Sequence, residues 1–432
     1  RGLGDVYKRQ TSMVYRMKRN GAGLASICIL ATMVLVMISS TTSLYFGEED
    51  ALSIRYPREI NIDISTLDTD LEKNGQMDNI ISDIKNICKN HDVKGTDAYT
   101  YLNGMISGMI TDDGKVETDI NRIDNFSNIA LGDFSSVYSF IFIPVDDYNK
   151  IMGTSYTLKD DEAIIYNYRN DSRYKNNVIS FNRGQSFKIV KETDEFVIDT
   201  NAAISVTPSM ALIVNDIDNA TKGLTYNATT AQKIENTGIN FHRYYCFDTG
   251  VSPQHQIELS KDIANYLDGN IEKYRADTSS RMFRSSVESK EQNRLDFFSL
   301  YGGLFGLGII LSIVFIFAAV LIIYYKQISE GYEDQSRFEI MQKVGMTKNE
   351  IRKSINSQLL TVFFLPLIFA GMHLAFAAPI IKKLLLMFNI TNLNFFIVTV
   401  VISFAIFSLF YMIVYKITSS AYYRIVSGAK EG

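Results

Sequence analysis

Four long stretches without a charged side chain constrain this chain more than any other feature. They lie at residues 21–46, 297–325, 359–381 and 395–415. Each reaches the ~20 residues that a helix needs to cross the hydrocarbon core of a bilayer. Backbone amides find no water there, so such stretches must be helical. The sequence therefore predicts an α-helical membrane protein with four spans and a large α+β domain between spans one and two.

Charges that flank the first span predict the orientation. Three basic residues precede it and three acidic residues follow it: Arg16, Lys18, Arg19, then Glu48, Glu49 and Asp50. Positive charge collects on the cytoplasmic side, so we expect a multi-pass protein of the cell membrane with both termini in the cytoplasm. A signal peptide is less favoured, because the apolar stretch exceeds a signal core and no A-x-A cleavage site follows it.

The same rule assigns the segments between the spans. The loop 326–358 and the tail 416–432 are expected in the cytoplasm, and residues 47–296 and the short loop 382–394 outside it. Two lysines in the short loop, Lys382 and Lys383, oppose the rule, and we expect their side chains to reach the headgroups.

Residues 1–10 share no pattern with the rest and resemble a translated sequencing-adapter scar. We therefore expect residues 11–20 to be a native cytoplasmic segment and the chain to be the C-terminal part of a longer protein.

The cytoplasmic loop, residues 326–358, has the pattern of two helices joined at a glycine; we call it the elbow. Helix-forming residues run to Val344, and Gly345 supplies a stop because glycine adopts the left-handed cap conformation freely. Thr347 and Glu350 then fit the capping box that begins a second helix, which we expect to continue into the third span.

The first helix of the elbow carries a short apolar stripe of Ile340, Met341 and Val344. Charged residues at Arg337, Glu339 and Lys343 lie beside it. Such a surface suits docking on a partner protein. A charged connector lying on lipid headgroups is the alternative, because amphipathicity alone does not separate the two.

The external region, residues 47–296, is acidic. Its net charge is about −14, whereas the remaining residues carry about +10. This balance disfavours nucleic acid and suits a cationic partner such as a peptide, although ordinary solubility explains it equally simply.

Its pattern predicts both strands and helices. Strands are expected at residues 54–64, 137–143, 162–168, 187–198, 210–214 and 243–247, with a hairpin turn at 191–195. Helices are expected at 77–89, 256–274 and 279–297, the last running without a break into the second span.

Catalytic and metal-binding motifs are not found in the sequence. It has no H-E-x-x-H, G-x-S-x-G or C-x-x-C pattern. The run from Gly108 to Lys115 resembles a phosphate loop only superficially, because it has one residue too many between its glycines and Val116 replaces the required Ser or Thr. We therefore expect no enzyme activity and no metal site in this chain. Cys88 and Cys246 are both external, and their pairing is left open.

Two features of the spans suggest helix contacts. Gly302 and Gly306 form a G-x-x-x-G pair, which lets helices approach closely in lipid. His373 is the one ionisable His, Asp, Glu, Lys or Arg residue inside a span; a structural contact and a proton relay are both open for it.

The segment from Arg337 to Ile351 resembles the cytoplasmic signature of FtsX-like (MacB-type) permeases of ABC transporters. Glu339 and Ile340 match the leading acidic-Ile pair of that signature, and Gly345 matches its helix break. Met346 stands where the family often has alanine. One span, a large external domain and three further spans resemble the C-terminal half of the BceB-type subgroup.

The resemblance implies a membrane permease subunit that binds no cofactor itself, with ATP and Mg²⁺ on a separate cytoplasmic ATPase. It further implies bacterial antibiotic resistance or sensing, in which a sensor kinase pairs with the permease and the ligands are cationic antimicrobial peptides bound to lipid-linked cell-wall precursors. The residues that would couple to the ATPase are Arg337, Glu339, Ile340, Met341, Val344, Gly345, Met346, Thr347 and Glu350.

Two other classes remain open. One is a non-transporting regulator of an external cell-wall hydrolase, as in cell-division FtsX, or a lipoprotein-release component. The other is a membrane sensor that works without an ATPase.

Overall fold

A computed structural model describes residues 2–111, 114–119, 137–168, 176–194, 196, 208–224, 238–345, 347–387, 390 and 393–426. The chain divides into two compact units. The helical unit comprises Arg1–Glu48 and Phe297–Gly432, and the globular unit comprises Glu49–Asp296. Each unit is described by itself.

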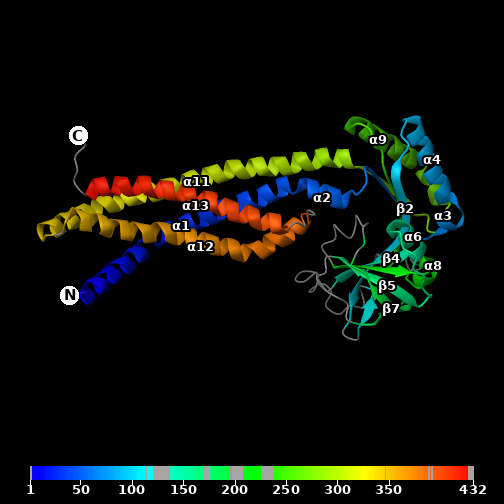
Figure 1. Ribbon diagram of the computed structural model, residues 1–432, viewed down its shortest axis with the longest axis horizontal. Helices are drawn as coiled ribbons and strands as arrows, with labels where there is room; N and C mark the ends of the chain where they lie inside the picture. The colour runs from blue at the N-terminus through cyan, green and yellow to red at the C-terminus, as the bar shows by residue number, and fades with distance from the viewer. Residues whose placement is uncertain are drawn as a thin grey trace. The chain divides into compact units, whose positions relative to one another are not determined.

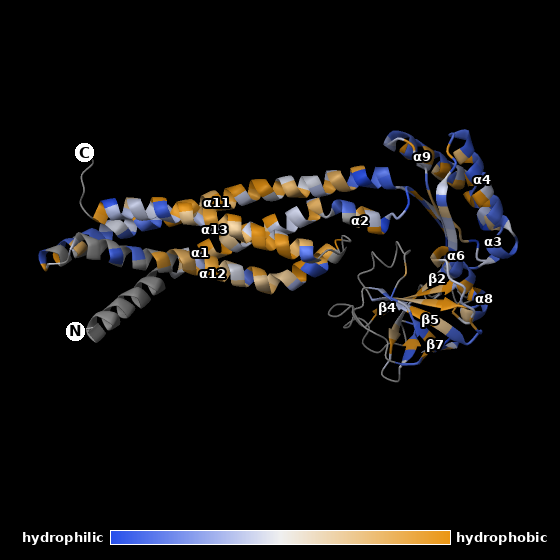
Figure 2. Ribbon diagram, viewed as in Figure 1, coloured by the Kyte–Doolittle hydropathy of each residue, from blue (hydrophilic) through white to orange (hydrophobic). Residues whose placement is uncertain are grey.

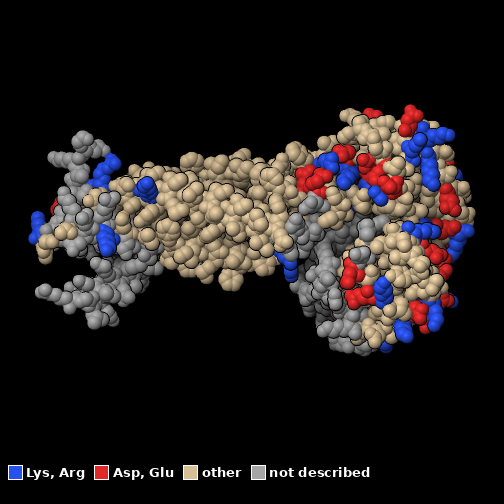
Figure 3. Space-filling model, in the orientation of Figure 1, with Lys and Arg blue, Asp and Glu red and all other residues tan. Residues whose placement is uncertain are grey.

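Four long helices make up the helical unit: α1 (Gly2–Phe46), α11 (Lys290–Lys343), α12 (Lys348–Met387) and α13 (Leu393–Val426). All four are long and apolar enough to cross a membrane. Their middle parts are hydrophobic, and the space-filling view shows a wide band over them without charge (Figures 2 and 3). The predicted fold class, four spans with a large mixed α and β region between the first and second, is confirmed.

The candidate membrane spans within these helices coincide with the prediction at the first, extend beyond it at the second and fourth, and begin and end four residues later at the third. They are Gly21–Phe46, Lys290–Ile340, Phe363–Leu385 and Asn394–Val426. The helices extend because polar residues that are good helix formers continue the backbone hydrogen bonding past the apolar part.

Helix α1 packs against both α12 and α13. His373 on α12 takes part in this packing, because its Nδ1 atom lies 3.3 Å from the Thr32 hydroxyl oxygen of α1. The histidine left open in the sequence is therefore a contact between two helices. Glycine serves the packing of α12 on α13, where a side chain at Gly371 would lie 3.0 Å from the ring of Phe404.

The globular unit is built on one ten-stranded sheet with the strand order β10-β1-β9-β2-β3-β6-β7-β5-β8-β4 (Figure 1). The strands are β1 (Ile60–Thr66), β2 (Thr96–Ile110), β3 (Lys115–Glu117), β4 (Val137–Pro144), β5 (Glu162–Asn167), β6 (Val178–Phe181), β7 (Ser186–Glu192), β8 (Ser209–Val214), β9 (Asn240–Asp248) and β10 (Arg284–Ser289). Its helices are α2 (Glu48–Arg55), α3 (Asp70–Lys73), α4 (Gln76–Asn90), α6 (Val145–Met152), α8 (Ile217–Ala220), α9 (Pro253–Gly269) and α10 (Ile271–Ala276).

Strand β2 organises the sheet because it pairs with three others. Its first part pairs with β9, and its last part pairs with both β4 and β3. The extra pairing with β4 closes seven strands into a ring. Gly104 and Gly108 lie on β2 where the walls of this ring come close, because a side chain there would meet Ile239 at 2.7 Å and Val116 at 2.8 Å.

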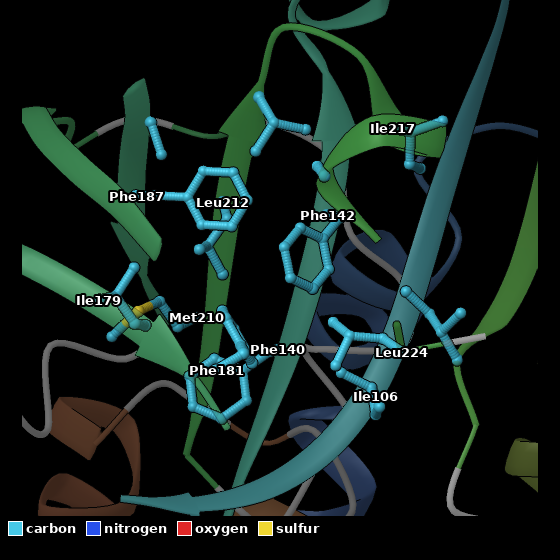
Figure 4. Packing of buried hydrophobic residues seen from close by; sticks show 14 of the residues in the cluster. Ile106, Phe140, Phe142, Ile179, Phe181, Phe187, Met210, Leu212, Ile217 and Leu224 are labelled. Carbon is cyan, nitrogen blue, oxygen red and sulfur yellow. The ribbon is translucent and has the colours of Figure 1, made fainter. Parts of the chain in front are cut away.

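Large apolar side chains fill the ring. Phe140, Phe142, Phe181 and Phe187 lie against one another and against residues of the opposite wall (Figure 4). All four are nearly or wholly buried. The closed ring is therefore a packed core rather than a pore.

The remaining three strands, β10, β1 and β9, form a twisted sheet with the first part of β2, and helices cover one face of it. Apolar residues of α4 and α9 cover it, among them Ile80, Ile84, Leu259 and Ile263. The isoleucines of α4 recur at the spacing that predicted this helix, and the prediction is confirmed.

Three of the local predictions were wrong. Residues 54–59 are not strand, because α2 continues to Arg55 and β1 begins at Ile60. Residues 284–289 form β10, an edge strand held by β1, rather than the first half of a helix. Lys191 and Glu192 belong to β7 instead of a turn, because β5 pairs with them. The three cysteines, Cys28, Cys88 and Cys246, are all free.

Candidate functional site

The elbow consists of the end of one long helix, a turn at a glycine and the start of the next helix, as the sequence predicts. Helix α11 ends at Lys343, a turn follows at Val344 and Gly345, and α12 begins at Lys348. Gly345 has φ +104°, a conformation that side-chain-bearing residues rarely adopt. Thr347 lies directly before the first helical residue of α12, the position of an N-cap. Both helices continue from the elbow into candidate membrane spans.

One face of the α11 end is anchored to the end of α13. Phe338 packs with Tyr422 and Val426, and all three are almost completely buried. The Tyr422 hydroxyl donates a hydrogen bond of 2.6 Å to the buried Asp334 carboxylate. Gly331 allows the close approach, since a side chain there would lie 3.4 Å from the Tyr422 ring. The residues on α11 recur at i, i+3 and i+7, so they share one face.

The other side of the same helix is exposed. Ile340 is 62% exposed and Val344 is 84% exposed. At 100° per residue, Ile340 lies on the side of α11 away from the anchored face. Val344 follows directly after α11, and its N–H still donates to the Ile340 carbonyl at 3.1 Å, so it lies on the same side. Glu339 and Lys343 are exposed beside them. The elbow therefore presents an apolar pair among charges on a helix that is fixed from behind.

For four of the predicted coupling residues, the structure does not describe the position of the side chain. Met346 lies outside the described residues. Arg337, Met341 and Glu350 have described backbone only, and all three are helical. The role of all nine predicted coupling residues stays a prediction.

Sequence reasoning missed the anchoring residues Asp334, Phe338 and Tyr422. A signal was present on α11, where Gly331, Asp334 and Phe338 share a helical face. The partner residue on α13 is 88 positions away from Asp334, and nothing in the local pattern indicates it.

The glycines of α11 have different surroundings. A methyl group at Gly302 would touch the Tyr45 ring of α1 at 3.7 Å, an ordinary contact. At Gly306 it would meet nothing within 4 Å. The close approach falls at Gly308, where the added group would lie 2.7 Å from the Thr41 hydroxyl oxygen of α1. Within this chain, Gly308 is thus the glycine that α1 requires, and the G-x-x-x-G pair as a motif stays a prediction.

The globular unit holds its ionic groups in structural pairs. Arg243 makes a bidentate pair with Glu72, with both hydrogen bonds at 2.8 Å, and it also donates to Asp147 at 3.3 Å. Glu117 accepts a hydrogen bond from Asn182, and Asp119 pairs with Arg183. Among the described residues, no group of three or more His, Cys, Asp or Glu side chains is arranged to hold a metal ion.

Buried groups in this unit have shifted pKa values. Burial raises the pKa of the Cys88 thiol to about 11 and that of Cys246 to about 12. Both thiols are therefore protonated at neutral pH and poor nucleophiles. Burial also raises the pKa of Glu288, although Arg55 and the Tyr56 hydroxyl act in the opposite direction.

Comparison with known proteins bears on the elbow directly. Residues 309–428 match the family described as FtsX-like permease C-terminal. The elbow segment resembles FtsX-like permeases. The matched residues contain most of the apolar part of α11, the elbow, and all of α12 and α13.

The chain is also 23% identical over 378 residues to the ABC transporter permease protein YxdM of Bacillus subtilis (strain 168). The aligned part covers 85% of this chain and 50% of YxdM. The chain therefore spans about half the length of this curated relative. The two similarities support an FtsX-like permease subunit with several membrane spans, and the BceB-type subgroup stays a prediction.

Proposed function

We propose that this chain is a membrane permease subunit of an ABC transporter complex, and that the elbow docks on a separate cytoplasmic ATPase. The observation that carries the proposal is the exposed pair Ile340 and Val344 on a helix whose opposite face is anchored by Phe338. Exposed apolar side chains on a firmly held helix suit a protein contact, because little ordering entropy is lost on binding. The similarity to FtsX-like permeases supports the same partner.

In this proposal Gly345 transmits the movement of the ATPase. The residues on either side belong to α11 and α12, and each helix continues into a candidate span. A shift at the elbow would therefore displace two spans together. The chain of α11 also extends back to Lys290, so the same helix connects by sequence to the globular unit. ATP and Mg²⁺ would be bound by the partner, and this chain would supply no catalytic group.

We also propose that the globular unit lies outside the cell and binds a cationic antimicrobial peptide that is itself bound to a lipid-linked cell-wall precursor. A sensor kinase is the second membrane partner in this proposal. The net charge of about −14 over residues 47–296 supports a cationic ligand. Addition of such peptides should then raise the ATP hydrolysis of the purified complex. If an external hydrolase copurifies and peptides have no effect, a regulator of cell-wall hydrolysis is the better description.

Docking can be tested by copurification of the ATPase with the full-length protein from membranes. We expect Glu339→Arg and Ile340→Asp to lose the ATPase. Burial of an isoleucine side chain is worth about 1.5–3 kcal/mol, so its loss should weaken binding by roughly 10- to 150-fold. The matched control is Lys383→Glu, a charge reversal at an exposed residue in the last part of α12.

If both elbow variants retain the ATPase as well as the control does, the elbow is not the docking site. If no ATPase copurifies with the unaltered protein, the permease assignment itself fails, and the external unit should be studied as a receptor.

A further inference from the structure

A groove of about 570 Å³ lies between α11 and α13. Tyr324 and Ile328 line it from α11, and Lys416, Ile417, Arg424 and Ile425 line it from α13. The residues on α11 are one helical turn apart, and those on α13 recur over slightly more than two turns. The groove is therefore an open depression along two helix faces, and its size falls in the range of small-molecule sites.

The lining combines apolar and basic chemistry. Three isoleucines and a tyrosine provide its apolar surface, and Lys416 and Arg424 provide two positive charges. Arginine presents a planar set of donors that fits a phosphate, and lysine adds a point charge. The groove thus suits an anion that also has an apolar part.

The position of the groove along the helices narrows the choice of anion. Tyr324 lies at the end of the predicted second span, residues 297–325, and Lys416 is the first residue after the predicted fourth span, residues 395–415. Tyrosine and lysine are both favoured where the hydrocarbon core meets the headgroups. Figure 3 shows basic side chains beyond the end of the uncharged band over the helices. The groove therefore lies where the phosphate of a phospholipid and the first carbons of its acyl chains are found.

We propose that this groove binds an anionic phospholipid, with its phosphate held by Lys416 and Arg424 and the first part of an acyl chain lying against Tyr324 and Ile328. Basic pockets between membrane helices on the cytoplasmic side are favourable sites for such headgroups. A lipid seated there contacts α11 and α13, the same two helices that the Tyr422–Asp334 hydrogen bond joins. It would reinforce the anchored face of the elbow. The proposal does not depend on the ATPase, since binding is measured without it.

The test is native mass spectrometry of the purified full-length protein titrated with phosphatidylglycerol or phosphatidylcholine in detergent. We expect preferential retention of phosphatidylglycerol. Attraction of an anionic lipid by each basic side chain implies about fivefold weaker binding for Lys416→Gln or Arg424→Gln, and about 25-fold for both together. The matched control is Lys382→Gln with Lys383→Gln, two basic residues on α12 that do not line the groove. Thermal melting in detergent confirms that each variant is folded.

Three results would overturn the proposal. Equal retention of the two lipids would show that the groove does not select charge. An equal loss in the control pair would show attraction without a site. Displacement of phosphatidylglycerol by soluble glycerol phosphate at a similar concentration would show that the groove binds a free phosphate rather than a lipid.

Discussion

Replacement of Gly345 by valine should uncouple the elbow without unfolding the helical unit. The residue has φ +104°, and a side chain there would meet nothing within 4 Å. The cost of the substitution is therefore conformational and involves no collision. Holding a side-chain-bearing residue in such a region costs about 1–3 kcal/mol, and valine is among the least tolerant because it is branched at Cβ. The elbow geometry should become roughly 5- to 150-fold less populated.

The assay is ATP-dependent activity of the full-length complex at matched membrane expression, together with thermal melting. We expect activity to fall steeply while melting changes little, because the added side chain displaces no neighbour. Gly345→Asn should lose less than Gly345→Val, since asparagine tolerates positive φ better. The control is Gly303→Val, which also adds its side chain in open space but in a regular helix. Normal activity of a normally expressed Gly345→Val protein would refute the reasoning.

Three further substitutions test the packing and the charges. Gly308→Val should destabilise the helical unit by about 1–3 kcal/mol because Thr41 must move, whereas Gly306→Val should not, as thermal melting would show. Arg243→Ala leaves Glu72 without its cation and removes the less exposed of the two cations beside Asp147, and it should cost roughly 3–5 kcal/mol in urea unfolding. Glu288→Gln should stabilise the globular unit at neutral pH. Burial raises the pKa of Glu288, so the folded state favours the protonated carboxyl. The stability that this protonation contributes is fully present below the ordinary pKa of 4.5 and is lost as the pH rises through the raised pKa.

The elbow was predictable because its elements are local. The helix up to Lys343, the glycine at position 345 and the start of α12 follow from propensity, from the freedom of φ and from a capping residue. These causes act within a few residues of one another. The anchoring of the same helix was not predictable, because Asp334 and Tyr422 meet only when α11 and α13 lie side by side.

Strand β2 shows why the sheet could not be derived in the same way. Its sequence contains Asn103, Gly104 and Gly108, which are poor strand formers. The strand forms because β9, far along the chain, and β4 both pair with it. Residues 284–289 were expected to be helical, but they form an edge strand because they pair with β1. In both places, long-range pairing overrides local propensity.

The sequence by itself determined the four membrane helices, the mixed globular region between the first two and the glycine elbow. The membrane helices depend on the length of the apolar stretches, the mixed region on the local spacing of apolar residues, and the elbow on the conformational freedom of one glycine. None of these causes requires a distant partner. Only the tertiary structure decided which face of α11 is anchored and which is exposed, how seven strands close around the phenylalanine core, and where Lys416 and Arg424 line a groove with α11. These features bring together residues far apart in the chain, and free energy is gained only when the distant surfaces meet.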